Sequence, residues 1–590
     1  MYSPYRNSEI GKKNVSSPVI VTAQILPYLA TITAAFPSAN LQPRAACSGN
    51  TASDRSVWCD YSTSTDYYNV IPDTGVTREY WFELTDVTIA PDGVSRVAMA
   101  VNGTVPGPTI IADWGDTVTV HVTNKLTTSM NGSSIHFHGI RQNYTNQADG
   151  VTSVTQCPTP PGSTEIYTWR ATQYGSSWYH SHFALQAFEG IFGGIIINGP
   201  ATANYDYDLG NLMLLDWSHQ TADELYDDAQ LNGPVTMDTG LINGTNVYGS
   251  DGSTTQTGYR FNTTFTSGSS YLLRLVNTAI DTHFKFSIDN HTMKVIAADF
   301  VPIVPYTTTT LAIGMGQRYD VIVTADQSSV ASDFWMRAIP QVACSESDNV
   351  DGIKGIIHYG SSTGTPTTTG HSYTDECLDE LSTNIVPYLS KTVGAVTITD
   401  DEAVSVTTNS DNFFRWTMNA TSMLINWENP TLLQQYNGVA ASEFSNTSHL
   451  IDLPNAGEWV YVVITEPSIP VAHPIHLHGH DFYVVASGTG TYDSSTVTLN
   501  LSNPPRRDVA TLPASGYLVL AFETDNPGAW LMHCHIGWHT LEGFALQFLE
   551  QSALIDSMAL IDYDALNSTC SAWNTYTAAN AIVQTDDSGI

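Results

Sequence analysis

The chain has 590 residues, of which 42% are hydrophobic and 13% are charged. The length predicts several domains, and the composition predicts a folded protein with an uncharged polar surface rather than a disordered chain. A formal net charge of −36, from 21 Lys and Arg against 57 Asp and Glu, repels polyanions and argues against nucleic acid or acidic membranes as partners. A neutral or cationic small molecule is easier to accommodate.

The first 45 residues differ from the rest of the chain. Arg6, Lys12 and Lys13 precede an uncharged stretch whose apolar part covers residues 19–36, interrupted by a glutamine and a proline. The apolar region of a secretory signal runs about 7–15 residues, whereas a membrane-spanning helix needs about 20. We therefore predict an export signal and a short pro-segment over residues 1–45, and no membrane anchor.

Cysteines and glycosylation sequons also indicate export. Six of the seven cysteines can pair in an oxidising compartment, and the seventh needs another role. Cys534 has a histidine on each side, so we set it apart. Ten Asn-x-Ser/Thr sequons after residue 45 favour a secreted, extracellular glycoprotein. They begin at Asn102, Asn131, Asn143, Asn243, Asn262, Asn290, Asn419, Asn446, Asn500 and Asn567.

From about Thr77 onward the chain consists of short β-prone runs separated by turn residues. This pattern predicts an all-β fold of antiparallel sandwiches with little helix. Stretches rich in turn residues at 198–211 and 360–372 indicate linkers that divide the chain into three blocks. The segments "DWGDTVTVHVTN" and "GEWVYVVITE" each precede a histidine-rich run at a similar interval, which favours repeated domains.

Four histidine clusters dominate the sequence. They read "HFHG" from His136, "HSHF" from His180, "HPIHLHGHD" from His473 and "HCHIGWH" from His533. Because residues two apart in a strand face the same way, each His-x-His pair places two imidazoles on one face, where they can chelate a metal. The clusters supply ten candidate ligands of this kind: His136, His138, His180, His182, His473, His476, His478, His533, His535 and His539.

The last cluster carries the most informative spacing. Strand alternation sends His533 and His535 to one face and Cys534 to the other, so one strand can serve two metal sites. A thiolate with two imidazoles and no strong fourth ligand favours copper in an electron-transfer centre. His473 and His539 are available as the two imidazoles.

Neither a structural role for the histidines nor a zinc site explains all four clusters. A lone His-x-His pair is usually structural, but four clusters around a central His-Cys-His are not explained that way. Zinc also takes His and Cys, yet a structural zinc site closes with four ligands and cannot occupy all the candidates. His219, His283, His291 and His480 fit no chelating pattern, and we expect ordinary packed or hydrogen-bonded roles for them.

The four clusters, in this order, resemble the copper-binding signatures of the multicopper oxidases. The resemblance extends from about Cys47 to the end of the chain and implies four copper ions. It assigns His473, Cys534 and His539 to a type 1 copper, and His136 and His476 to a type 2 copper. Phe137 stands where laccases usually have Trp. The implied ligands of the type 3 pair are His138, His180, His182, His478, His533 and His535.

The same resemblance implies three consecutive cupredoxin-like Greek-key β-sandwich domains, at 46–205, 206–365 and 366–551, the last including a linker. A tail over 552–590 follows. Its final residues, Asp587 to Ile590, resemble the processed end of ascomycete-type laccases, whose terminal carboxylate plugs the solvent channel to the copper cluster. The implied disulfides are Cys47–Cys59, Cys157–Cys570 and Cys344–Cys377.

Three further residues match functional positions of the family. Phe544, ten residues beyond Cys534, occupies the axial position of the type 1 copper and offers no donor atom, which should raise the redox potential. Asp281 matches the acidic residue beside the type 1 pocket, where it can take the proton of an oxidised phenol. Asp149 matches a carboxylate that helps supply protons to bound oxygen, although its Asp-Gly dipeptide also encodes a turn.

The function implied is that of a laccase. Phenolic or other small aromatic substrates would give single electrons to the type 1 copper, and electrons would pass through Cys534 to His533 and His535, where dioxygen is reduced to water. We expect a monomer without nucleic-acid or membrane partners. A ferroxidase would need an iron site built of carboxylates, and a copper-storage protein would be expected to lack part of the ligand set.

Overall fold

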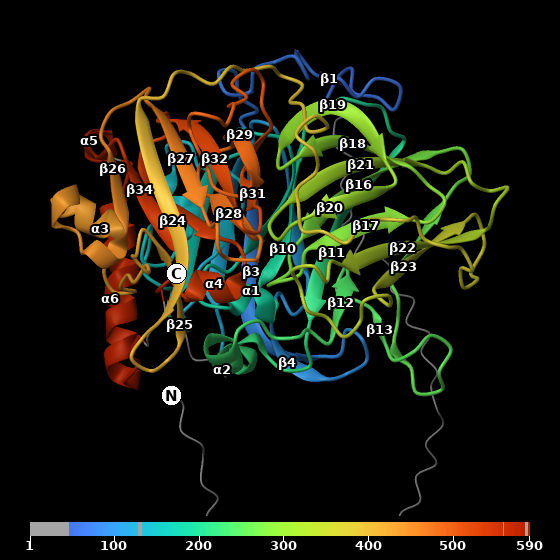
Figure 1. The fold of residues 1–590 in the computed structure, drawn as a ribbon, viewed down its shortest axis with the longest axis horizontal. Helices are drawn as coiled ribbons and strands as arrows, with labels where there is room; N and C mark the ends of the chain where they lie inside the picture. Colours follow the sequence, from blue (N-terminus) through green and yellow to red (C-terminus); the bar gives the residue numbers. More distant parts are fainter. Residues whose placement is uncertain (1–46, 128–131, 559, 585–587) are drawn as a thin grey trace, which may run out of the picture. The chain divides into compact units, whose positions relative to one another are not determined.

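The computed structural model describes residues 47–127, 132–558, 560–584 and 588–590 (Figure 1). The predicted signal and pro-segment, the sequon at Asn131 and Asp587 lie outside these residues. The described chain forms three cupredoxin-type β-sandwiches followed by a helical tail, which confirms the expected all-β architecture.

In the first sandwich, apolar and polar residues alternate along the strands because one face of each sheet is buried. In β3, Tyr80, Phe82 and Leu84 point inward, whereas Glu79 and Trp81 lie on the exposed face. One sheet has the order β4 (Arg96–Val101), β3 (Thr77–Ile89), β6 (Thr117–Asn124) and β8 (Thr164–Arg170). The other has the order β5 (Gly107–Asp113), β10 (Phe192–Asn198), β9 (Gly175–His180) and β7 (His136–Phe137).

The second sandwich is larger than the first, with sheets of six and five strands. The six-stranded sheet has the order β12 (Thr239–Ile242), β11 (Tyr207–Trp217), β16 (Ser270–Asn277), β21 (Arg318–Thr324), β18 (Met293–Ala298) and β19 (Val301–Thr308). The five-stranded sheet has the order β15 (Asn262–Phe265), β23 (Lys354–Tyr359), β22 (Asp333–Pro340), β17 (Phe284–Ile288) and β20 (Thr310–Ile313).

The third sandwich repeats this arrangement. Its six-stranded sheet has the order β25 (Phe414–Met418), β24 (Ile398–Thr408), β27 (Trp459–Thr465), β32 (Gly516–Glu523), β29 (Phe482–Thr489) and β30 (Arg506–Arg507). Its five-stranded sheet has the order β26 (Leu450–Leu453), β34 (Ala545–Glu550), β33 (Gly528–Cys534), β28 (His473–Leu477) and β31 (Val509–Leu512). Every residue of β28 and β33 is buried, so the two histidine clusters on these strands lie in the interior.

The faint internal similarity of the sequence has a topological basis. Each domain contains two parallel strand pairs, one in each of its sheets. In one sheet the pairs are β3 with β6, β11 with β16 and β24 with β27, and in the other they are β5 with β10, β15 with β23 and β26 with β34. The two similar segments form β6 and β27, which hold equivalent places in the first and third domains. Residues 360–397 connect β23 to β24 without a helix or strand, while the second predicted linker is shorter than expected because β11 already begins at Tyr207.

Most of the tail is helical, a feature that the sequence pattern did not predict. It contains α5 (Ser552–Ser557) and α6 (Tyr563–Asn580), and Cys570 on α6 is bonded to Cys157 of the first domain. The other pairs are Cys47–Cys59 and Cys344–Cys377, so all three implied disulfides are present. The remaining helices are α1 (Gln186–Glu189), α2 (Ala222–Asn232), α3 (Thr431–Tyr436) and α4 (Gly537–Leu541).

We expect the Cys157–Cys570 disulfide to be a main tie between the tail and the body of the protein. The bond joins residues 413 apart in sequence, and a cross-link across so long a loop restricts the unfolded chain most. Replacing both cysteines with alanine should lower the free energy of unfolding by about 2–4 kcal/mol and expose α6 to proteases. Thermal unfolding and limited proteolysis measure the two effects, with Cys344→Ala/Cys377→Ala as the short-loop control. An unchanged melting temperature and an intact tail would contradict this expectation.

Candidate metal centre

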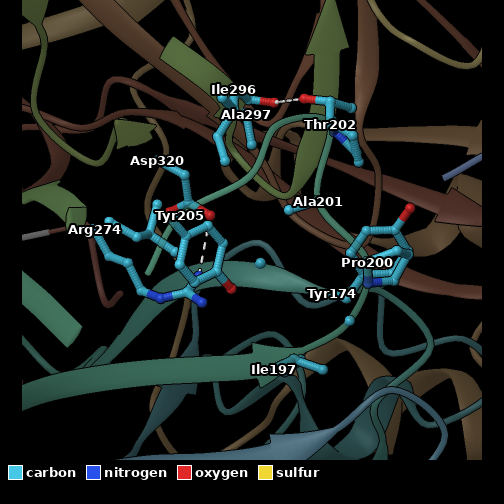
Figure 2. Close-up of a pocket in the computed structure, with 14 residues that line it drawn as sticks. Tyr174, Ile197, Pro200, Ala201, Thr202, Tyr205, Arg274, Ile296, Ala297 and Asp320 are labelled. Atoms are coloured by element: carbon cyan, nitrogen blue, oxygen red, sulfur yellow. Dashed lines mark hydrogen bonds and ion pairs between the residues drawn. The ribbon is translucent and has the colours of Figure 1, made fainter. Parts of the chain in front are cut away.

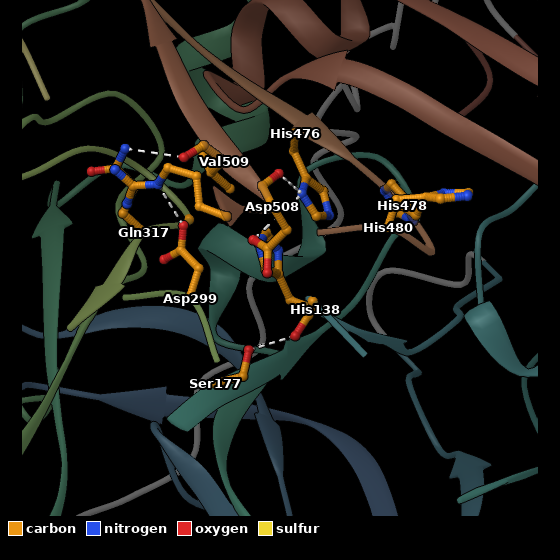
Figure 3. Close-up of polar contacts among 12 residues, drawn as sticks. His138, Ser177, Asp299, Gln317, His476, His478, His480, Asp508 and Val509 are labelled. Atoms are coloured by element: carbon orange, nitrogen blue, oxygen red, sulfur yellow. Dashed lines mark hydrogen bonds and ion pairs between the residues drawn. The ribbon is translucent and has the colours of Figure 1, made fainter. Parts of the chain in front are cut away.

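Eight histidines that are far apart in the sequence meet between the first and third domains. β7 and β9 present ligands from the first domain, and β28 and β33 present ligands from the third. Neighbouring rings have centroids between 3.9 and 6.0 Å apart. Figure 3 shows His138, His476 and His478 within this group. Its members are His136, His138, His180, His182, His476, His478, His533 and His535.

Hydrogen bonds leave one nitrogen of several of these imidazoles free. Nδ1 of His136 donates to the carbonyl oxygen of Asp149 at 2.7 Å, and Nδ1 of His476 donates to that of Asp508 at 2.7 Å. A carbonyl can only accept, so it fixes the proton on Nδ1 and leaves the lone pair on Nε2. Within the described chain, Nε2 of His136, His180 and His476 has no hydrogen-bond partner although it is buried.

A metal accounts for these unpaired nitrogens. Burial, followed by the mutual repulsion of the rings, lowers the pKa of His180, His182 and His478 well below its ordinary value. The imidazoles are therefore neutral near pH 7, which is the form that binds metal ions. Imidazole donors suit copper, so the residues fit the group that the sequence implies.

The Asp149 carboxylate lies against this cluster, fully buried. Its Oδ2 accepts a hydrogen bond of 2.9 Å from Nδ1 of His478. Asp149 ends a short 3-10 helix, and Gly150 follows at φ 76°. A Cβ on Gly150 would lie 1.8 Å from the carbonyl oxygen of Ile135, so glycine is required there. Asp149 can therefore belong to an Asp-Gly turn and also lie beside the histidine cluster, because the turn directs its carboxylate at His478.

Asp508 is a second carboxylate at the cluster, and the sequence reading missed it. Its Oδ1 lies 3.2 Å from Nε2 of His138, and Arg318 of the second domain donates to its Oδ2 at 2.6 Å (Figure 3). A Cβ on Gly316 would lie 2.9 Å from the ring of His535. The second domain therefore abuts the cluster although it supplies none of the predicted ligands. The available signal was the run "RRD" at residues 506–508, because two adjacent arginines are unusual in a chain with only 21 Lys and Arg.

A separate group lies on the other side of β33. Sγ of Cys534 is 3.7 Å from Nδ1 of both His473 and His539, and these two nitrogens are 3.1 Å apart. His473 begins β28, Cys534 ends β33 and His539 lies on α4. Burial raises the pKa of the Cys534 thiol well above its usual range, so a thiolate there needs a bound cation. Two imidazoles and one thiolate are the donor set of an electron-transfer copper.

Aromatic rings close the remaining side of this group. The Phe544 ring is fully buried, and its centroid lies 5.0 Å from that of His473. Trp416 packs on His539 and His473 with centroids 4.4 and 4.7 Å away. The backbone N–H of Cys534 donates to the carbonyl of Phe544 at 3.0 Å, which holds the ring beside the thiol. Phe544 offers no donor atom from this position.

The Asp281 carboxylate lies on a loop that a second aspartate holds in place. Asp216, at the end of β11, accepts backbone N–H bonds from Ile280, Asp281 and Thr282 at 2.9, 3.0 and 3.0 Å. The N–H of Gly537 donates to the carbonyl of Ile280 at 3.0 Å, so the loop is tied to α4, which carries His539. Burial, and then the charge of Asp216, raise the pKa of Asp281 well above its ordinary value. Sequence reading did not identify Asp216.

Glu466 is a further residue that sequence reading missed. Its Oε2 lies 3.0 Å from Nε2 of His473, and both side chains are fully buried. Neither carboxylate oxygen has a hydrogen-bond partner in the described part of the chain. Glu466 follows β27 and His473 begins β28, so one short loop brings them together. A carboxyl oxygen only 3.0 Å from Nε2 favours a proton on that nitrogen and leaves Nδ1 for a metal.

The C-terminus reaches the histidine cluster. Ile590 is 3% exposed and lines a cavity with His180, His182, His533 and His535. The hydroxyl of Ser153 donates to the carbonyl of Gly589 at 2.6 Å, and the N–H of Ser588 donates to that of Leu541 at 2.9 Å. These contacts hold the last three residues against the first and third domains.

Three of the four histidines that fit no chelating pattern have partners within the protein. His219 lies 2.8 Å from Asp92, His480 lies 3.1 Å from Glu550, and Nε2 of His291 lies 2.6 Å from the hydroxyl of Tyr359. A further cavity, where the first two domains meet, is lined by Arg274 and Asp320, which pair with each other at 3.0 Å (Figure 2). Its described lining contains no histidine or cysteine.

Comparison with known proteins agrees with this geometry. Three models described as multicopper oxidase match residues 83–202, 208–362 and 424–553. Laccase-2 of Botryotinia fuckeliana is 47% identical over 563 residues, covering 94% of this chain and 95% of that protein. Laccase of Cryphonectria parasitica is 42% identical, covering 93% and 95%. The crystal structure of the laccase from Botrytis aclada has a TM-score of 0.87 and 47% identity, covering 92% of this chain and all of that one.

The Glu466 contact predicts how firmly metal is held at His473, Cys534 and His539. Glu466→Leu removes the carboxyl group beside Nε2 of His473 and should weaken copper binding there by about 10–100-fold. Glu466→Gln keeps an oxygen acceptor and should bind copper nearly as the wild type does. Copper content after dialysis against a chelator, together with the visible absorption of the type 1 site, distinguishes the variants. Equal retention in the leucine and glutamine variants would contradict an orienting role.

Proposed function

The chain belongs to the multicopper oxidase family, as a laccase of the ascomycete type, and on that premise we propose that it oxidises phenolic and related small aromatic substrates by one electron at a time. The copper ions of the family, when bound, accept those electrons and reduce dioxygen to water. His473, Cys534 and His539 would hold the type 1 copper. His136 and His476 would hold the type 2 copper, and the other six clustered histidines the type 3 pair.

The observation that supports this proposal most directly is that one strand, β33, contributes ligands to both metal groups. Cys534 faces His473 and His539, while its neighbours His533 and His535 face the eight-histidine cluster. Only a few covalent bonds therefore separate the two metal groups. The carbonyl of Cys534 also accepts a hydrogen bond of 2.8 Å from Nδ1 of His533. Both connections lie within one buried strand, which can conduct electrons from the substrate side to the oxygen side.

Asp281 supplies the proton acceptor in this proposal. A phenol that loses an electron becomes strongly acidic, and a carboxylate beside the electron acceptor can take its proton. The Asp216 hydrogen bonds keep the Asp281 loop at α4, which carries His539. The raised pKa of Asp281 makes it a stronger base than an exposed aspartate. On the oxygen side Asp149 and Asp508 lie at the cluster, where carboxylates can deliver protons.

Export and glycosylation belong to the same proposal. Three disulfides suit an oxidising compartment, and the sequons provide sites for N-linked sugars. Among the described residues no helix is long and apolar enough to span a bilayer. We propose a secreted, monomeric glycoprotein that acts on phenols outside the cell, including those released from lignin.

Oxygen uptake with two classes of reductant tests the proposal. Copper-loaded enzyme should consume one dioxygen for every four one-electron oxidations of a simple phenol. Ferrous iron at the same concentration should support much slower oxygen uptake. Among the described residues, neither sequence nor geometry identifies an iron site built of carboxylates. Faster turnover of ferrous iron than of the phenol would favour a ferroxidase instead. A protein that binds copper but consumes no oxygen would favour storage.

The pH dependence of phenol turnover tests Asp281. Its carboxylate must be ionised to accept a proton, and its pKa is raised, so phenol turnover should fall as the pH drops through that raised value. Asp281→Asn should remove this limb and lower kcat for phenols by about 10²–10⁴-fold. A dye that loses an electron but no proton should be oxidised at the wild-type rate by the same variant. Equal effects on phenol and dye would point to a structural role.

A further inference from the structure

Trp81 is unusual because a large aromatic side chain stands on an exposed sheet face. It is 61% exposed, whereas Trp114 and Trp169 of the same domain are 0% and 1% exposed. Its neighbours along β3 on that face are Glu79 and Glu83. Single exposed apolar residues are common on protein surfaces, so a role for Trp81 has to be argued from what surrounds its ring.

One face of the Trp81 ring is covered and the other is open. Trp81 is the register partner of His121 on β6, and the two rings are stacked with centroids 5.1 Å apart and planes 1° apart. Ile166 on β8 is the next residue in this row and is 56% exposed. Because β3 lies between β4 and β6 in the sheet, the open face of the indole is directed toward the β4 edge.

The β4 edge carries a glycosylation sequon at this position. Asn102, Gly103 and Thr104 form the turn that follows β4, and Asn102 adopts a φ of 53°. The Oδ1 atom of Asn102 accepts from the N–H of Glu83 at 2.7 Å, and Nδ2 lies 3.0 Å from the carbonyl oxygen of Trp81. The amide nitrogen that would carry a sugar is therefore held beside the main chain of Trp81.

We propose that an N-linked oligosaccharide on Asn102 packs its first sugar residues against the open face of Trp81. The C–H groups of a pyranose ring form an apolar surface that fits an aromatic ring, while its hydroxyls can bond to the carboxylates of Glu79 and Glu83. The occupant is an N-acetylglucosamine-based glycan carried by the chain itself. The proposal rests on the glycosylated export proposed above, and it names one modified residue and the surface that its glycan covers.

Thr104 provides a matched pair of variants. Thr104→Ala destroys the sequon but keeps the Asn102 amide and its hydrogen bonds, whereas Thr104→Ser keeps the sequon. Full-length enzyme is produced in a secreting fungal host, and glycan occupancy at each sequon is determined by mass spectrometry of peptides. Hydroxyl-radical footprinting then measures the oxidation rate of Trp81 in the native, copper-loaded protein.

We expect a glycan on Asn102 in the wild type and in Thr104→Ser, and none in Thr104→Ala. Trp81 should oxidise severalfold faster in Thr104→Ala than in the other two proteins. Glycans on other sequons but not on Asn102, or equal Trp81 oxidation despite an occupied Asn102, would overturn the proposal.

Two other outcomes separate the possible causes of failure. Absence of sugar from every sequon would refute the proposed glycosylated export, and with it this inference. Protection of Trp81 that persists in Thr104→Ala and grows with enzyme concentration would place a second copy of the chain on this face, and would also overturn the proposal.

Discussion

The alternation of side chains along one buried strand determines the rest of this molecule. Because side chains alternate along a strand, Cys534 faces His473 and His539 while His533 and His535 face the opposite side, where the eight-histidine cluster lies. That constraint fixes the position of β33 between the two groups. It requires ligands from β28 and α4 on one side and from β7, β9 and β28 on the other. The first and third domains must therefore pack against each other for the cluster to exist.

Bringing eight imidazoles together in the protein interior would be unfavourable if they were charged. Burial lowers the pKa of most of the eight, and backbone carbonyls at His136, His476 and His533 hold the remaining protons on the outer nitrogens. The lone pairs are thus directed to the centre before any metal binds. Because these hydrogen-bond acceptors are main-chain carbonyls, the orientation of the imidazoles depends on the fold and not only on the identity of the ligands.

The sequence predicted the features that depend on local spacing. Histidines two residues apart, the isolated cysteine among seven and alternation within strands are visible without tertiary structure, and they predicted the β-sandwich fold and the candidate ligands. Asp508, Glu466 and Asp216 could not be identified this way, because their roles come from contacts with residues distant along the chain. The helical tail was missed since its helix α6 is held by Cys570 and by packing rather than by a strong amphipathic pattern.

The placement of the few cations links the composition to the architecture. The chain has 21 Lys and Arg in 590 residues, yet Arg318, Arg506 and Arg507 are 0–2% exposed. Arg318 pairs with Asp508 across two domains, and Arg507 pairs with Asp299 at 2.8 Å. A buried ion pair contributes little net stability, but breaking it leaves an uncompensated charge, so such pairs favour one arrangement of the domains. Each of these Arg–Asp pairs is neutral, so the net charge of −36 is carried by the residues outside these joints.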